Sequence, residues 1–148
     1  MPVVEKSITI RAPVEKVFAV VDDPNRLQEY MVGITRTTDI VRTSGRIGDS
    51  VRFTYSVMGL RFPGKATTLE WKENQRIVVR LEGGIGGTFT ATLQPEGAST
   101  RVNWHFDYTM RGGILGKAAN ALLVERMNER NVERGLENLK MLCEARDD

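Results

Sequence analysis

The chain has 148 residues, of which 41% are hydrophobic and 27% are charged, a composition typical of a soluble globular domain. The formal net charge is only +2, and the basic residues form no run that would follow a phosphate backbone, so no nucleic-acid partner is expected. The one cysteine, Cys143, excludes an intrachain disulfide and indicates a reducing compartment. No apolar stretch reaches the ~18 residues of a membrane span, and the first residues do not resemble a signal peptide, so we expect a cytoplasmic protein.

The first part of the chain predicts one strand and two short helices. Residues 3–11 alternate between apolar and polar side chains, as in a half-buried strand. Pro13 then occupies a position favoured at the start of a helix, and apolar residues recur after it at helical spacing as far as Val21. Residues 24–31 have the pattern of a second short helix.

The middle of the chain predicts an antiparallel sheet. Six runs alternate with a period of two, at about residues 34–43, 50–59, 63–73, 76–83, 86–95 and 99–110. Short connections rich in glycine join these runs, so neighbours in sequence are expected to pair as a meander. One face of the strands is apolar and the other polar, which predicts one buried and one solvated face.

The last segment, residues 114–146, lacks proline and is rich in Ala, Leu, Glu and Arg, which predicts a long helix. An apolar stripe runs along it through Val132, Leu136, Leu139 and Cys143. A seven-stranded sheet with one apolar face needs a cover, and this helix is the largest element able to provide it. Because one helix cannot fill a sheet that curls through its twist, residues 1–148 are expected to form one α+β domain with room for a pocket.

Six short segments, in this order and spacing, carry a family resemblance: SITIRAP at 7–13, VF at 17–18, DPNR at 23–26, GDSV at 48–51, TRVNW at 100–104 and NLK at 138–140. Together they resemble the START-like, birch-pollen-allergen-like superfamily called SRPBCC, and most closely its polyketide cyclase/dehydrase branch. The resemblance covers nearly the whole chain. It implies a helix-grip fold, in which a curved seven-stranded sheet wraps a long C-terminal helix around an apolar cavity. The superfamily includes lipid carriers and aromatase/cyclases, so the fold alone does not choose an activity.

The candidate ligand-binding residues are the side chains directed between the sheet and the long helix. They are Phe53, Tyr55, Val57, Trp71, Val79, Leu81, Phe89, Ala91, Phe106, Tyr108, Met110, Ala118, Ala121, Glu125 and Asn128. Tyr55 and Tyr108 combine an apolar ring with a polar group, and Asn128 would offer a ligand a hydrogen bond. Glu125 would face the sheet as a candidate acid or base if the helix is continuous. A break near residues 120–125 would turn it outward, and we favour this interpretation.

Three connections that contain glycine have functional interpretations beside their role as turns. Residues 83–87 form a hairpin that would serve as a mobile flap at the mouth of the pocket. Residues 58–64 would expose Leu60 and Phe62, which would mark a ligand entrance or a surface for a protein partner. Residues 111–113 would act as a hinge before the helix.

The sequence suggests no metal site, no cofactor and no catalytic triad. The only histidine, His105, alternates to the solvated face and lies far in sequence from Cys143. Catalytic residues therefore remain unassigned.

Two functions fit these observations. The first is binding of a small hydrophobic molecule (a lipid, isoprenoid, polyketide or aromatic compound) by a carrier or sensor. The alternative is an enzyme of the polyketide cyclase/aromatase type acting in the same cavity. An enzyme needs ionisable groups that converge in the pocket, and the sequence supplies only Glu125, whose orientation it leaves open. Binding is the favoured function for this reason.

Overall fold

The computed structural model describes residues 2–110 and 118–145 of the chain, with the backbone alone for residues 118–120. Its elements in chain order are β1 (Val3–Ile10), α1 (Val14–Val21), the 3-10 helix η1 (Pro24–Arg26), α2 (Leu27–Tyr30), β2 (Ile34–Val41), β3 (Ser50–Val57), β4 (Leu60–Lys72), β5 (Arg76–Gly83), β6 (Ile85–Glu96), β7 (Ser99–Met110) and α3 (Ala118–Glu144). The expected hinge at residues 111–113 lies outside the described residues.

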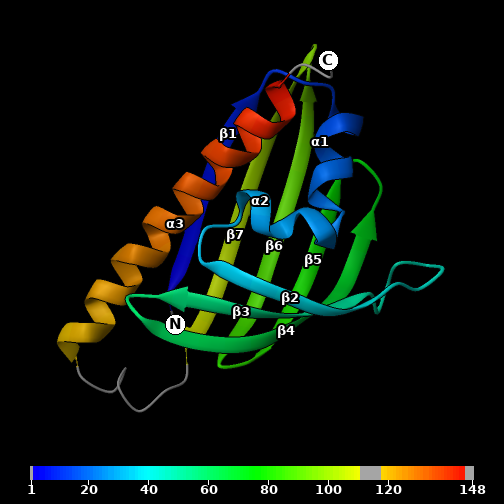
Figure 1. Ribbon diagram of the computed structural model, residues 1–148. Helices are drawn as coiled ribbons and strands as arrows, with labels where there is room; N and C mark the ends of the chain where they lie inside the picture. The colour runs from blue at the N-terminus through cyan, green and yellow to red at the C-terminus, as the bar shows by residue number, and fades with distance from the viewer. Residues whose placement is uncertain (1, 111–117, 146–148) are drawn as a thin grey trace.

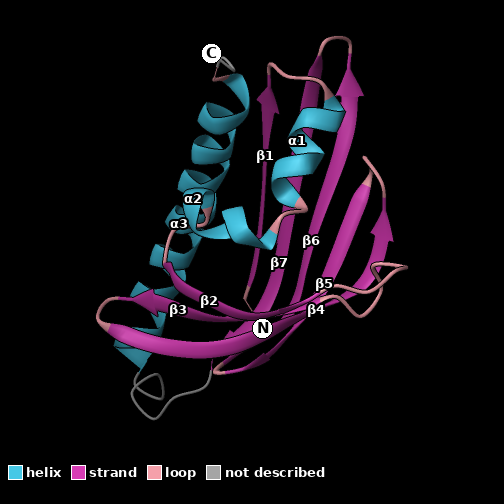
Figure 2. Cartoon of the chain, turned by 45° about the vertical axis from the view of Figure 1, so that its right-hand side comes forward, coloured by secondary structure: helices cyan, strands magenta, loops and turns pink. Residues whose placement is uncertain are grey.

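The strands form one antiparallel sheet in the order β1-β7-β6-β5-β4-β3-β2. In Figures 1 and 2, β2, β3 and β4 run nearly crosswise to β1, β6 and β7, so the sheet is strongly curved. The helix α3 lies along β1 on the concave side, and α1 and α2 cover more of that side. This arrangement confirms the expected helix-grip fold with two short helices after the first strand.

The expected apolar stripe of α3 is confirmed, because Val132, Leu136, Leu139 and Cys143 are all buried. Val124 extends the stripe toward the start of the helix. The described part of α3 is continuous from residue 118, so the predicted break near residues 120–125 is wrong.

The expected exposed loop at residues 58–64 is also wrong. Met58 and Gly59 both have positive φ angles, 52° and 77°, which is the conformation of a tight two-residue hairpin turn. Such a turn matches the twist of the strands, so β4 pairs with β3 from the Val57–Leu60 pair onward. Phe62 therefore lies in a strand and is only 4% exposed. The expected exposure of Phe62 is therefore wrong, and residues 58–64 do not line the cavity described below.

The expected hairpin at residues 83–87 is present, with Gly84 between the end of β5 and the start of β6. Its backbone is packed against neighbouring strands. The Gly84 N–H donates to the Pro63 carbonyl at 2.8 Å. A Cβ atom on Gly87, whose φ is 121°, would overlap the backbone carbonyl of Asp107 on β7. Close approach of the strands therefore explains this glycine.

Candidate ligand-binding cavity

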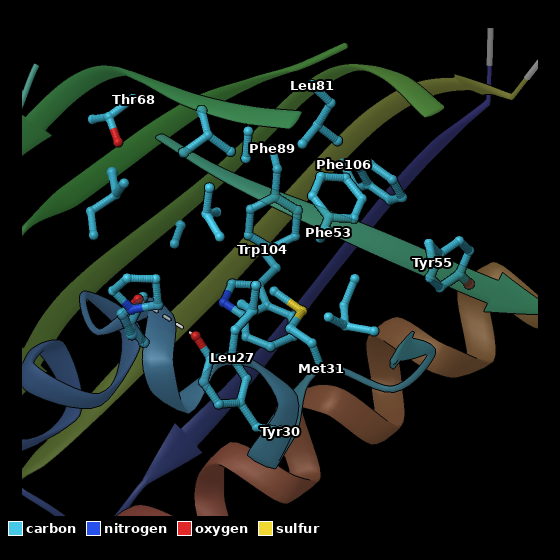
Figure 3. Close-up of a pocket in the computed structure, with 18 of the residues that line it drawn as sticks. Leu27, Tyr30, Met31, Phe53, Tyr55, Thr68, Leu81, Phe89, Trp104 and Phe106 are labelled. Atoms are coloured by element: carbon cyan, nitrogen blue, oxygen red, sulfur yellow. Dashed lines mark hydrogen bonds between the residues drawn. The ribbon is translucent and has the colours of Figure 1, made fainter. Parts of the chain in front are cut away.

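A cavity of about 220 Å³ lies between the concave face of the sheet and the helices. Figure 3 shows aromatic and aliphatic side chains around it, with Thr68 and Tyr55 on opposite sides of the view and Phe89 and Trp104 between them. The wall is mostly apolar because the inward face of each strand carries the apolar half of its alternating pattern.

Several residues predicted from the sequence line this cavity together. They are Phe53, Tyr55, Val79, Leu81, Phe89, Ala91, Phe106 and Asn128. All but Asn128 lie on strands, where a strict period of two fixes the direction of each side chain.

The other predicted residues lie outside the lining. They are Val57, Trp71, Tyr108, Met110, Ala121 and Glu125, while the side chain of Ala118 is outside the described residues. Val57 is buried beside the hairpin turn, and Ala121 is half-buried on α3. Glu125 is exposed because it lies one residue, about 100° around the helix, from the buried Val124. It borders a separate surface depression with Tyr108.

Trp71 faces the concave side of the sheet as expected, but Leu69, which the alternation of the sequence placed beside it, does not, because a bulge lies between Thr68 and Glu70. Leu69 is consequently exposed, while Ala66 and Thr68 line the cavity. The Trp71 ring packs edge-on against Phe18 of α1, with ring centroids 5.8 Å apart.

A buried network of neutral groups joins α3 to the sheet on the Tyr55 side of the cavity. The Tyr55 hydroxyl donates to Asn128 Oδ1 at 2.6 Å and accepts from Asn131 Nδ2 at 2.8 Å. Asn128 Nδ2 donates to the Tyr108 hydroxyl at 2.9 Å and to Met110 Sδ at 3.2 Å. Tyr108 and Met110 thus support the network from behind.

Burial raises the pKa of Tyr55 to about 12, even though the hydrogen bond from Asn131 acts to lower it. Burial likewise raises the pKa of Tyr108, against the effect of its hydrogen bond from Asn128. Both phenols are therefore neutral at physiological pH. Asn131 was not among the residues predicted from the sequence, although it lies three residues after Asn128 and so shares its face of the helix.

Where the cavity meets solvent, four charged residues form a cluster that we call the rim: Asp22, Arg42, Arg46 and Asp49. Three of them line the cavity beside Val41, which is 51% exposed. Arg42 Nη1 lies 3.2 Å from Asp49 Oδ2 and 3.8 Å from Asp22 Oδ1. Arg46 lies 2.8 Å from Asp49 and 2.6 Å from Asp22. The rim therefore pairs two cations with two carboxylates.

Trp71 contacts two residues of the rim, Asp22 and Arg46. Its indole N–H donates to Asp22 Oδ1 at 3.0 Å, and the Arg46 guanidinium lies 5.0 Å from the centre of its ring. Desolvation raises the pKa of Asp49, but hydrogen bonds from Arg46, the Thr43 backbone N–H and Arg42 outweigh it and hold this pKa below its usual value. Asp49 is thus ionised at neutral pH although it is only 8% exposed.

Trp104 forms part of the wall beneath α3. It is 1% exposed, packs edge-on against Phe89 at 5.5 Å, and lies beside Tyr30 of α2 with ring centroids 6.0 Å apart. Gly135 allows this position, because a Cβ atom there would lie 2.9 Å from Trp104 Cζ3. Trp104 was not among the candidate ligand-binding residues, because alternation along β7 directs its ring inward but does not show that the ring borders a cavity.

Across residues 2–110 and 121–145, no group of three His, Cys, Asp or Glu side chains is arranged to hold a metal ion. His105 lies on the outer face of β7, where Nδ1 is 2.8 Å from a carboxylate oxygen of Glu5. Within the described ranges, no helix combines the length and apolar character needed to cross a membrane.

A curved sheet that closes on one long helix around an apolar cavity defines a fold that binds hydrophobic ligands. The chain belongs to the family described as polyketide cyclase/dehydrase and lipid transport, whose sequence model matches residues 1–144. No curated protein matches the chain.

Solved structures show the same fold over nearly full length. The protein TTHA0849 of Thermus thermophilus is 26% identical, with 94% of each chain covered and a TM-score of 0.80. The Zhui aromatase/cyclase of a Streptomyces species is 18% identical, with 97% of this chain and 93% of that one covered and a TM-score of 0.79. A START superfamily protein of Mycobacterium smegmatis is 16% identical, with coverages of 96% and 97% and a TM-score of 0.78. The latter two likenesses concern the fold alone.

Proposed function

We propose that this protein binds a small hydrophobic molecule, such as a lipid, isoprenoid, polyketide or aromatic compound, in the cytoplasm as a carrier or sensor. The observation that carries the proposal is an apolar cavity of about 220 Å³ whose charged side chains are paired with one another and whose Tyr55 and Asn128 side chains are hydrogen-bonded to each other. An apolar cavity of about 150 Å³ is enough to hold benzene, so this cavity has room for a molecule of about two rings.

The pairing of the charged groups and of the Tyr55 hydroxyl favours binding over catalysis. The single proton of the Tyr55 hydroxyl is already donated to Asn128, and its raised pKa makes this phenol a poor base at neutral pH. At the rim, both carboxylates are held by arginines. The described lining therefore offers a ligand a shaped apolar space without an unpaired acid or base.

The family and the likeness to an aromatase/cyclase fold support a second candidate, an enzyme of that type. Its reaction would rely on the shape of the cavity to fold a flexible substrate, with Tyr55 as a proton donor. Tyr55 would first have to release Asn128, which makes this candidate the weaker one.

Native mass spectrometry of the purified protein, followed by organic extraction, tests the proposal directly. We expect a co-purified apolar compound, and we expect the neutral two-ring probe 2-acetylnaphthalene to bind to the emptied protein. Incubating any extracted compound with the protein separates the two candidates, because a carrier returns it unchanged and an enzyme converts it.

A matched pair of variants locates the binding site. Ala91→Leu places a larger side chain in the cavity and should weaken binding of 2-acetylnaphthalene by about tenfold or more. Ala19→Leu makes the same change at an exposed position of α1 and should bind like the wild type. Equal binding by all three proteins, or no binding by any, would contradict the proposal.

A further inference from the structure

We propose that the cavity selects uncharged ligands, and that Asp22 and Asp49 set this selectivity by cancelling the charge of the two arginines at the rim. The inference rests on the proposed function and deepens it, because it names the charge class of the ligand.

The interior of the cavity offers a ligand no opposite charge, since even the Trp104 indole N–H, a buried donor without a hydrogen-bond partner among the described residues, is neutral. Beyond the rim, the described side chains that line the cavity are uncharged, and the polar ones on the Tyr55 side are an amide–phenol network. An ionised ligand group in this space would lose its hydration and gain no opposite charge, which is strongly unfavourable. A charged group on a ligand would therefore have to stay at the rim.

An arginine at a cavity mouth is the usual partner for a ligand carboxylate, because its planar group matches the two oxygens. Here Arg42 Nη1 already faces Asp49 at 3.2 Å, and its Nη2 donates to the Asp22 backbone carbonyl at 2.9 Å. Arg46 is held between the same two carboxylates. Two positive and two negative charges therefore sum to zero at the rim.

The rim is fixed in this arrangement by contacts that do not depend on a ligand. Trp71 donates to Asp22 and lies under Arg46, and the Thr43 backbone N–H donates to Asp49. A ligand carboxylate would have to displace an internal carboxylate from its arginine and would meet repulsion from both aspartates. A neutral molecule meets neither obstacle.

Two probes with the same ring system and different charge test the inference: neutral 2-acetylnaphthalene and anionic 2-naphthoate. Their dissociation constants are measured by calorimetry at neutral pH and low salt. For the wild type, we expect 2-acetylnaphthalene to bind at least about tenfold more tightly. Asp22→Asn retains an oxygen acceptor for Trp71. It should reduce the ratio of the dissociation constants of 2-naphthoate and 2-acetylnaphthalene by about tenfold, because 2-naphthoate binds more tightly. Asp49→Asn should change the ratio in the same direction.

Asp39→Asn is the matched control, because it removes the same charge from an exposed side chain of β2 that faces Arg52 at 3.6 Å. It should leave the ratio unchanged. Added salt should reduce the gain in the Asp22→Asn protein, as expected for a charge effect and not for a change of shape.

Three results would overturn the inference while leaving hydrophobic binding intact. They are equal affinity of the wild type for both probes, an unchanged ratio in folded Asp22→Asn and Asp49→Asn proteins, and an equal gain in Asp39→Asn. Failure of both probes to bind the wild type would contradict the proposed function and the inference together. Circular dichroism establishes that each variant is folded.

Discussion

The amide–phenol network and the rim solve the same problem in opposite ways. Both connect a helical segment to the sheet through polar groups at the edge of an apolar cavity. The network uses neutral groups, Tyr55, Asn128 and Asn131, and lies beneath α3. The rim uses full charges and lies where Arg42 and the neighbouring Val41 reach solvent.

The difference follows from the cost of removing a charge from water. Ion pairs are tolerated at the rim because solvent still reaches one side of the cluster. Beneath α3 the same pairs would have to overcome a desolvation cost that neutral hydrogen bonds largely avoid. The network should therefore respond to the loss of a hydrogen-bond partner, whereas the rim should respond to pH and salt.

The largest effect is expected from Asn128→Ala in the network. The change removes the acceptor for Tyr55 and the donor to Tyr108, so two buried hydroxyls lose a partner and a small void opens. We expect a loss of about 3 kcal/mol in the free energy of unfolding, measured with urea.

The control for this prediction is Asn138→Ala. Asn138 is half-buried on the same helix and makes one longer bond, 3.3 Å, to the Tyr30 carbonyl. Its removal should cost less than about 1 kcal/mol. Similar losses of unfolding free energy in the two variants would show that the network stabilises the fold no more than the single hydrogen bond of Asn138 does.

At the rim, Asp49→Asn should lower the free energy of unfolding at neutral pH by about 1–2 kcal/mol. The folded protein holds the pKa of Asp49 below its ordinary value, so this stability is present above that value and is lost as pH falls through the folded pKa. The difference in the free energy of unfolding between the wild type and Asp49→Asn should therefore disappear as pH falls below about 4. Urea unfolding of both proteins from neutral to acid pH measures this difference. A difference that stays constant with pH would contradict a lowered pKa of Asp49 in the folded protein.

A smaller effect is expected in alkali, from the network. Because burial raises the pKa of Tyr55 to about 12, its neutral form stabilises the folded state below pH ~10, and that contribution is lost as pH rises toward 12. Between neutral pH and about pH 11, the free energy of unfolding should fall by about 1 kcal/mol more in the wild type than in the Tyr55→Phe protein. An equal dependence of the free energy of unfolding on pH in both proteins would mean that the pKa of Tyr55 is not raised by folding.

The smallest effect is expected from Glu125→Gln, outside both regions. Its exposed side chain should change stability by less than about 0.5 kcal/mol and leave binding of 2-acetylnaphthalene unchanged. A loss of probe binding would return Glu125 to the candidate site.

The sheet and the long helix could be predicted from the sequence because their periods are sustained over many residues. The strand predicted at residues 76–83 has the same limits in the structure, and the apolar stripe of α3 is buried as expected. The errors lie where one residue changes the geometry. The turn at Met58–Gly59 lengthens β4, and the bulge near Leu69 shifts the alternation, so that Thr68 faces inward and Leu69 outward.

For the cavity, alternation could place side chains such as Phe53 and Phe89 on the inner face, where the structure has them. The rim could not be found in this way. It depends on a tertiary contact between the end of α1 and the loop that holds Arg46 and Asp49, and periodicity carries no information on such contacts.

Gly135 has a consequence for the depth of the cavity. Glycine inside a helix costs about 1 kcal/mol relative to alanine, yet here its missing side chain lets α3 rest directly on the Trp104 ring. Any larger residue at this position would hold the helix farther from the sheet and make the space beneath it taller. Position 135 therefore sets how closely α3 approaches the sheet, and with it the height of the space beneath the helix.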